Sequence, residues 1–162
     1  MNRLSESANS IAVLLKQRRE TVAVAESSTG GLISAALLAV PGASAYFVGG
    51  GVIYTKAARE ALLGIDMGTH PDLRPSTEAY ATLVANTMRD RLGATWGLSE
   101  TGAAGPSGNR YGDQAGHSCI ALAGPLSQST AIETGQTNRE ENMRLFAAHA
   151  LEVLLQVLRS AA

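Results

Sequence analysis

Two polar, glycine-rich segments contain the residue types from which hydroxyl chemistry could be built. The first, E-S-S-T-G-G at positions 26–31, follows a short apolar run and precedes a helical pattern; the second, T-G-A-A-G-P-S-G, spans positions 101–108. Ligands of open α/β sheets bind beyond the carboxyl ends of strands, so both segments are candidate binding loops. Free N–H groups at the start of a helix after position 31 would favour an anion or a developing oxyanion. Taken alone, the first segment is equally well explained as an ordinary helix cap and turn, and neither segment contains a nucleotide-binding fingerprint.

A serine nucleophile needs a base, and the chain offers few of them. The three histidines lie in unrelated segments, at His70, His117 and His149, and do not indicate a Ser-His-Asp triad. Of the 13 basic residues only Lys16 and Lys56 are lysines, and arginine keeps its proton. Because Lys16 falls in the N-terminal helix, a lysine base would be Lys56, with Tyr54 on the same strand face if the strand extends that far. The simpler alternative is a surface lysine at a helix start.

The bulk composition indicates one ordered domain. The chain has 162 residues, of which 45% are hydrophobic and 17% are charged. A net charge of -1 provides no basic surface for nucleic acid. One cysteine, Cys119, excludes an intramolecular disulfide and fits a reducing compartment. We find no signal peptide and no apolar run approaching the roughly 18 residues that span a bilayer. We therefore expect a cytoplasmic protein without a membrane partner.

The hydrophobic periodicity predicts the elements that must position the two loops. Helices are expected at 5–18, 31–40, 57–63, 76–92 and 138–158, and strands at 21–25, 46–54, 95–98, 117–123 and 130–133. Ser76 is expected to cap its helix, and the three glycines of 46–54 predict a bulge or a close backbone approach. Helices that alternate with short apolar strands predict a three-layer α/β/α domain over residues 1–162, with helices on both faces of a mixed sheet.

Several blocks of the chain together resemble one known family. E-S-S-T-G-G is followed, in order, by V-P-G-A-S-A-Y-F-V-G-G-G-V-I-Y-T, A-L-L-G-I and T-G-A-A-G-P-S-G. These blocks closely resemble the C-terminal domain of the competence/damage-inducible protein CinA, and the resemblance covers nearly the whole chain. It implies an α/β/α domain, usually a homo-oligomer, that hydrolyses the carboxamide of nicotinamide mononucleotide. The products would be nicotinic acid mononucleotide and ammonia, in pyridine-nucleotide salvage, and no metal or organic cofactor is implied.

The resemblance also implies roles for individual residues. The nucleophile of the family's E-S-C-T-G-G falls on Ser27, and the cysteine is replaced by Ser28. Arg139, with Arg144 as a second candidate, would suit a substrate phosphate. N–H groups of residues 29–31 would form an oxyanion hole. The expected substrate-binding residues are Glu26, Thr29, Gly30, Gly31, Arg59, Thr101, Gly102, Gly105 and Arg139.

Two segments depart from the family pattern. The family reads Y-S-N-E-A-K where this chain reads Y-T-K-A-A-R, so Arg59 stands at the position of the activating lysine and Lys56 lies three residues earlier. Positions three apart on a helix face the same side, which makes Lys56 the expected base and Tyr54 a proton relay. A lysine base must lose its proton, which burial or the charge of Arg59 would favour. The segment after Gly108 also differs. The alternatives are a nucleotide-binding or regulatory module that has lost the amidase, and an amidase for another carboxamide.

Overall fold

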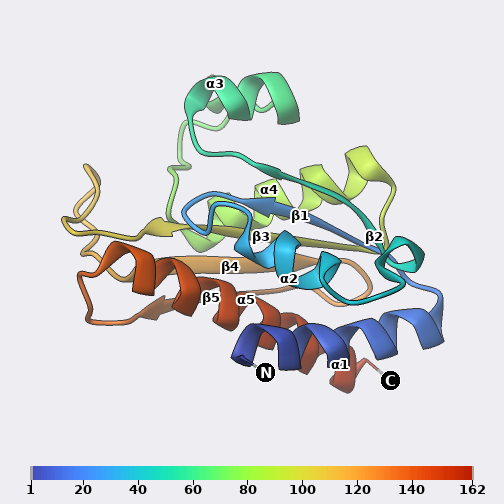
Figure 1. Cartoon of the computed structure of the whole chain (residues 1–162). Coiled ribbons are helices and arrows are strands. Elements are labelled where there is room, and N and C mark those ends of the chain that lie inside the picture. The colour runs from blue at the N-terminus through green and yellow to red at the C-terminus, as the bar shows by residue number, and fades with distance from the viewer. Residues whose placement is uncertain (1, 162) are drawn as a thin grey trace.

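A five-stranded mixed sheet forms the middle layer of the computed structural model, which describes residues 2–161 (Figure 1). The strand order is β2-β1-β3-β4-β5. The strands are β1 (Val22–Glu26), β2 (Phe47–Val52), β3 (Trp96–Ala103), β4 (His117–Ala123) and β5 (Gln128–Glu133). The first three are parallel, whereas β4 is antiparallel to both β3 and β5. The carboxyl ends of β1, β2, β3 and β5 therefore meet the amino end of β4 at one edge of the sheet.

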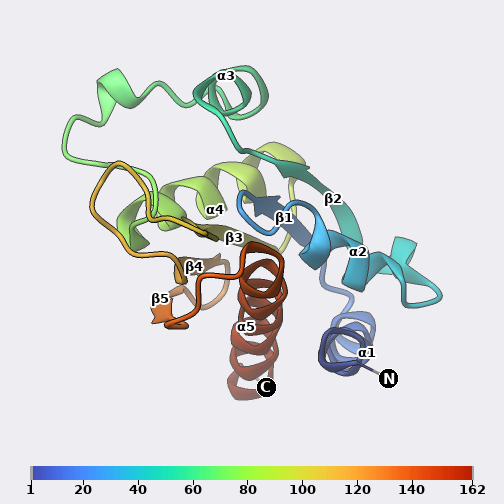
Figure 2. The same ribbon diagram turned by 60° about the vertical axis from the view of Figure 1, so that its left-hand side comes forward.

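Helices cover both faces of this sheet, which confirms the predicted three-layer architecture (Figure 2). On one face lie α1 (Arg3–Arg18), α2 (Leu32–Leu38) and α5 (Arg139–Ser160). On the other lies α4 (Glu78–Leu92), while the short α3 (Lys56–Ala58) continues into a π-helical turn at Arg59–Leu63. Two 3-10 turns occupy Ala43–Ala45 and Met67–Thr69. Within residues 2–161, no helix is both long enough and apolar enough to cross a bilayer.

The strands carry apolar residues on both faces because both faces are covered. Along β1, Val22 and Val24 pack into the cluster formed with α1, α2 and α5, whereas Ala23 and Ala25 pack against α4. The side chains of a strand alternate between faces, so one five-residue run serves two cores. This arrangement holds the end of β1, where the first polar loop begins, between two packed layers.

The second predicted loop begins later than expected. β3 continues to Ala103 because Thr101, Gly102 and Ala103 pair with the first three residues of β4. A side chain at Gly102 would run into the backbone of His117, so the residue has to be small. In contrast, β2 ends at Val52, and Tyr54 and Lys56 lie beyond it. The expectation that these two residues share a strand face was therefore wrong.

The glycine-rich strand β2 does contain the predicted irregularity. Val22 of β1 pairs with Phe47 but Ala23 pairs with Gly49, which leaves an extra residue in β2. A Cβ on Gly50 would lie 2.9 Å from the carbonyl oxygen of Val24, so the backbones also approach closely.

The start of α4 differs from the prediction by one residue. Its cap is Thr77, whose hydroxyl accepts a hydrogen bond from the N–H of Tyr80 at 3.2 Å. Ser76 instead adopts a left-handed conformation, with φ of 63°, and its N–H donates to the Thr101 hydroxyl at 3.1 Å. The end of β3 thus holds the turn that precedes α4.

Candidate active site

Two adjoining cavities open at the edge of the sheet where the parallel strands end. One has a volume of about 330 Å³ and the other about 210 Å³, and they share Tyr54, Gly102 and Asn109 in their walls. Of the predicted site residues, the larger cavity is lined by Ser27, Tyr54, Lys56, Arg59, Thr101 and Gly102. The smaller is lined by Tyr54, Gly102, Gly105 and Arg139, together with Ser28. The loops that meet here follow β1, β2, β3 and β5, and gather at the left of Figure 1.

Glu26, predicted to contact substrate, holds the start of α2 instead. Its side chain is 1% exposed, and one carboxylate oxygen accepts the N–H groups of Gly31 and Ile33 at 3.1 and 2.9 Å. The other oxygen accepts the N–H of Ser34 at 2.9 Å. The anion at this helix start is therefore the protein's own carboxylate, which satisfies N–H groups that the helix leaves free.

The predicted oxyanion hole at residues 29–31 is not formed. The N–H of Thr29 donates to Glu100 at 2.9 Å, that of Gly30 to the Ser27 carbonyl at 3.2 Å, and that of Gly31 to Glu26. Thr29 is fully buried, and none of these three residues lines either cavity. The prediction was wrong because the turn uses these donors to hold its own shape.

Glu100, which the sequence analysis missed, is the centre of this turn. The side chain is 2% exposed, and one oxygen accepts the N–H groups of Ser27 and Thr29, both at 2.9 Å. The other accepts the Ser28 hydroxyl. Burial raises the pKa of Glu100, and the hydrogen bonds from Ser28, Ser27 and Thr29 only partly oppose this. A single acid inside the apolar run of β3 was the available signal, because a buried acid nearly always has dedicated partners.

The Thr29 hydroxyl links the two buried carboxyl groups. Its oxygen lies 2.7 Å from an oxygen of Glu26 and 2.8 Å from one of Glu100. A hydroxyl has one proton and cannot fully donate to two carboxylates. It donates to one carboxyl group at a time and so links both of them to the same turn.

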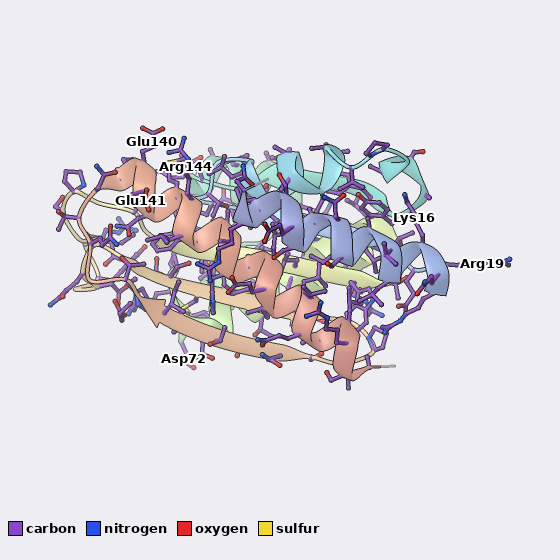
Figure 3. The ribbon with its side chains drawn as sticks, turned by 60° about the horizontal axis from the view of Figure 1, so that its bottom comes forward. Lys16, Arg19, Asp72, Glu140, Glu141 and Arg144 are labelled. Carbon is purple, nitrogen blue, oxygen red and sulfur yellow. The ribbon has the colours of Figure 1, made fainter. Side chains whose placement is uncertain are left out.

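Arg139 fixes two walls of the smaller cavity from the first turn of α5. One guanidinium nitrogen donates to the Gly105 carbonyl at 2.6 Å, and another donates to the Tyr54 hydroxyl at 3.0 Å. Because the Tyr54 oxygen is the acceptor in this contact, its O–H is still available to donate a hydrogen bond into the cavities. Arg144, the second candidate for phosphate, pairs with Glu140 at 2.8 Å and lies against a separate cavity between α1 and α5 (Figure 3).

Lys56 and Arg59 line the same cavity in opposite environments. The Lys56 side chain is 76% exposed, and its ammonium lies 3.8 Å from the carboxylate of Glu60. Arg59 is only 9% exposed, and its guanidinium stacks 5.9 Å from the ring centre of Tyr80. The burial expected around a lysine base is thus found around the arginine.

The segment after Gly108, which departs from the family pattern, forms the outer wall of both cavities. Asp113 binds Arg74 through two hydrogen bonds of 2.8 and 3.2 Å and accepts a third from Asn109 at 2.8 Å. The hydrogen bond from Arg74 holds the pKa of Asp113 below its usual range. Tyr111 lies between Arg74 and Arg110, whose charges are 5.1 and 5.0 Å from its ring centre. These contacts fix the segment after Gly108 as a wall of the two cavities, and the side chains of this wall can contact a ligand.

His117 supports the turn at Ser76 and is not a base for either serine. Its Nε2 lies 2.8 Å from the Ser76 carbonyl, and its Nδ1 contacts the Glu133 carboxylate. Both partners are acceptors, so both ring nitrogens carry protons. Burial opposes that charge, but the bonds to Ser76 and Glu133 and the charge of Asp113 outweigh burial and raise the pKa of His117. No group of three or more His, Cys, Asp or Glu side chains within residues 2–161 is arranged to hold a metal ion.

Comparison with known proteins gives one consistent result. Residues 4–158 match the CinA C-terminal domain family. CinA-like proteins from Desulfosudis oleivorans and Myxococcus xanthus are 42% and 39% identical over 90% and 91% of this chain. The chain spans 35% of the length of each of these two relatives.

Solved structures agree with the fold. The competence/damage inducible protein CihA from Agrobacterium tumefaciens aligns with a TM-score of 0.89 at 28% identity, over 98% of this chain and 97% of that one. A CinA superfamily protein from Klebsiella pneumoniae aligns with a TM-score of 0.91 at 24% identity, over 99% of both chains. The serine-bearing loop, the glycine-rich strand end and the α/β/α layers thus occur in a chain that belongs to the CinA C-terminal domain family.

Proposed function

We propose that the protein is a serine amidohydrolase that converts nicotinamide mononucleotide to nicotinic acid mononucleotide and ammonia. The observation that carries the proposal is the larger cavity, which Ser27 lines together with Tyr54, Lys56 and Arg59. A hydroxyl nucleophile beside a phenol and two cations suits acyl transfer on an anionic substrate. Membership of the CinA C-terminal domain family supports this choice of reaction, because that family includes nicotinamide-nucleotide amidases.

In this mechanism Ser27 attacks the carboxamide carbon. Its proton passes to Lys56 and then to the leaving amine, and the acyl-enzyme ester is hydrolysed by water. For Lys56 to act as the base, bound substrate has to displace water from the ammonium and separate it from Glu60, which a flexible lysine stem permits. Tyr54, held by Arg139, donates a hydrogen bond toward the reacting group. The N–H groups of residues 29–31 have no part in this mechanism.

A nucleotide-binding module without amidase activity is the second candidate. The observation that favours it is the exposed Lys56 paired with Glu60, together with an arginine where the family has its activating lysine. A third candidate, an amidase for another carboxamide, is favoured by the divergent wall at residues 109–113. All three share the same cavities, so turnover and binding have to be measured separately.

The test is release of ammonia from nicotinamide mononucleotide by the purified protein and by its Ser27→Ala and Lys56→Ala variants. Both variants should lose turnover, whereas Lys16→Ala should retain it. Lys16 is the chain's other lysine; it lies on α1, donates to the Pro41 carbonyl at 2.9 Å, and lines neither cavity of the site (Figure 3). Turnover that survives both substitutions would exclude the Ser27–Lys56 mechanism. Saturable nucleotide binding without turnover would favour the binding module.

A further inference from the structure

Arg59 is a buried cation without an anionic partner. It is 9% exposed, its Nε has no hydrogen-bond partner, and no carboxylate within residues 2–161 lies close enough to form an ion pair with it. Its contact with the Tyr80 ring, at 5.9 Å, only partly replaces the lost hydration. Burial of a charge is unfavourable unless the charge is paired. The guanidinium therefore has unused binding capacity, and it lines the larger cavity.

The charges around this cavity have one sign. Lys56 and Arg110 line it together with Arg59, and no aspartate or glutamate is among its lining residues. Of the nearby acids, Asp113 binds Arg74, whereas Glu60 contacts Lys56 and offsets its charge. Arg59 and Arg110 are then the cations of this cavity that have no carboxylate partner within residues 2–161, and together they attract a multiply charged anion more strongly than a singly charged carboxylate.

We propose that the larger cavity is a phosphate-monoester subsite with Arg59 as its central ligand. The planar guanidinium can bind two phosphate oxygens at once, and a tetrahedral dianion offers a third oxygen to Arg110. This inference rests on the proposed function in taking the monoester to be the 5′-phosphate of the substrate. Inorganic phosphate shares the same chemistry.

This assignment changes the role of one position. Arg59 stands where the family has its activating lysine, and arginine does not lose its proton, so the position serves binding. It also moves the phosphate away from Arg139, whose guanidinium already bonds Gly105 and Tyr54. With the phosphate at Arg59, the carboxamide of the same molecule can face Ser27 and Tyr54, which line the same cavity.

Calorimetric titration tests the proposal with three probes: nicotinamide mononucleotide, its dephosphorylated riboside and inorganic phosphate. The wild-type protein should bind the nucleotide about 10- to 100-fold more tightly than the riboside. Arg59→Gln should remove that difference and leave riboside binding unchanged, whereas Arg59→Lys should keep part of it. Arg144→Gln is the matched control because Arg144 is exposed on α5 and lines only the separate cavity. If inorganic phosphate binds as tightly as the nucleotide, free phosphate is the ligand; if it binds more weakly, the nucleotide is.

Thermal unfolding provides a second measurement that does not depend on turnover. Inorganic phosphate should raise the Tm of the wild-type protein and of Arg144→Gln, but not that of Arg59→Gln. Without phosphate, Arg59→Gln should unfold at the wild-type temperature or above it, because it removes an unpaired buried charge. Equal nucleotide and phosphate binding by wild type and Arg59→Gln would overturn the proposal. Nucleotide binding that depends on the phosphate group, without release of ammonia, would exclude the amidase activity and would still support the phosphate subsite.

Discussion

Replacing Glu100 by alanine or by glutamine should separate two roles of this carboxyl group. Alanine leaves three donors without an acceptor, namely the N–H groups of Ser27 and Thr29 and the Ser28 hydroxyl. Each unsatisfied buried donor costs about 1–3 kcal/mol, and water entering the vacated space recovers part of that. Glu100→Ala should therefore lower the free energy of unfolding by about 3–5 kcal/mol. Glutamine keeps an oxygen for both N–H groups and an amide that can donate to Ser28, so its cost should be about 1 kcal/mol or less.

The pH dependence of the glutamine variant tests the protonation of Glu100 itself. Burial raises the pKa of Glu100 above its ordinary value of 4.5. The folded state thus holds a proton that the unfolded state has released, and wild-type stability falls as pH rises from about 4.5 through the folded-state pKa. Glutamine does not titrate, so Glu100→Gln should gain stability relative to wild type across this window, and the difference should then level off.

Urea unfolding monitored by tryptophan fluorescence measures both effects. Trp96 is the chain's single tryptophan and is fully buried between the layers, so its emission reports the folded core. Glu141→Gln, an exposed change on α5 (Figure 3), is the control and should stay within about 0.5 kcal/mol of wild type at every pH. Glu100 does not have these two roles if Glu100→Gln lowers the free energy of unfolding as much as Glu100→Ala does, or if the difference between wild type and Glu100→Gln does not change with pH.

Three further predictions concern groups around the same edge of the sheet. Because the pKa of His117 is raised, its ionic contacts should stabilise the folded state fully below about pH 6.5, and this stabilisation should be lost as pH rises through the folded-state pKa. A plot of Tm against pH should lack this loss in His117→Gln. An identical slope in both proteins would contradict a raised pKa of His117. Burial raises the pKa of the Cys119 thiol to about 12, so iodoacetamide should label native protein at pH 8 at least about 100-fold more slowly than urea-unfolded protein, and equal rates would contradict it. If Arg139 acts through Tyr54, Arg139→Met and Tyr54→Phe should each reduce ammonia release by about 10- to 100-fold. The double variant should then lose little more activity than either single variant. Additive losses of activity would show that the two residues have independent roles.

The sequence predicts the layers of this fold well because both cores are built from simple alternation. Each short apolar strand has one set of residues for α4 and another for the opposite helices, as Val24 and Ala25 illustrate. The ends of strands are harder to predict where they depend on pairing with a strand that is distant in the sequence. β3 continues through Thr101 and Gly102 because β4 pairs with them, although the local sequence is typical of a loop.

For the site, the sequence predicts which loops meet but not which polar groups remain free. In the sequence, the position of Glu26 before Ser27 is compatible with a ligand contact or with a cap of the following helix. Only the path of the turn in space shows that Glu26 caps α2. Glu100 lies 73 residues from Ser27 along the chain, so no local pattern connects them. The burial of Arg59 similarly depends on Tyr80 of α4, which packs against it from a different element.

The chemistry that this edge of the sheet can support depends on which of its polar groups already have hydrogen-bond partners and which do not. Glu26, Glu100 and the N–H groups of residues 29–31 are used within the turn, so they set the position of the serines and have no capacity left for a ligand. The Ser27 hydroxyl and the buried Arg59 Nε have no hydrogen-bond partner within residues 2–161, and the residues Ser27 and Arg59 both line the larger cavity. A hydroxyl and a buried cation in one cavity are the reason for proposing a substrate in which a reactive carbonyl and an anionic group belong to the same molecule. A neutral carboxamide would leave the Arg59 charge buried and unpaired, whereas the proposed nucleotide would pair it.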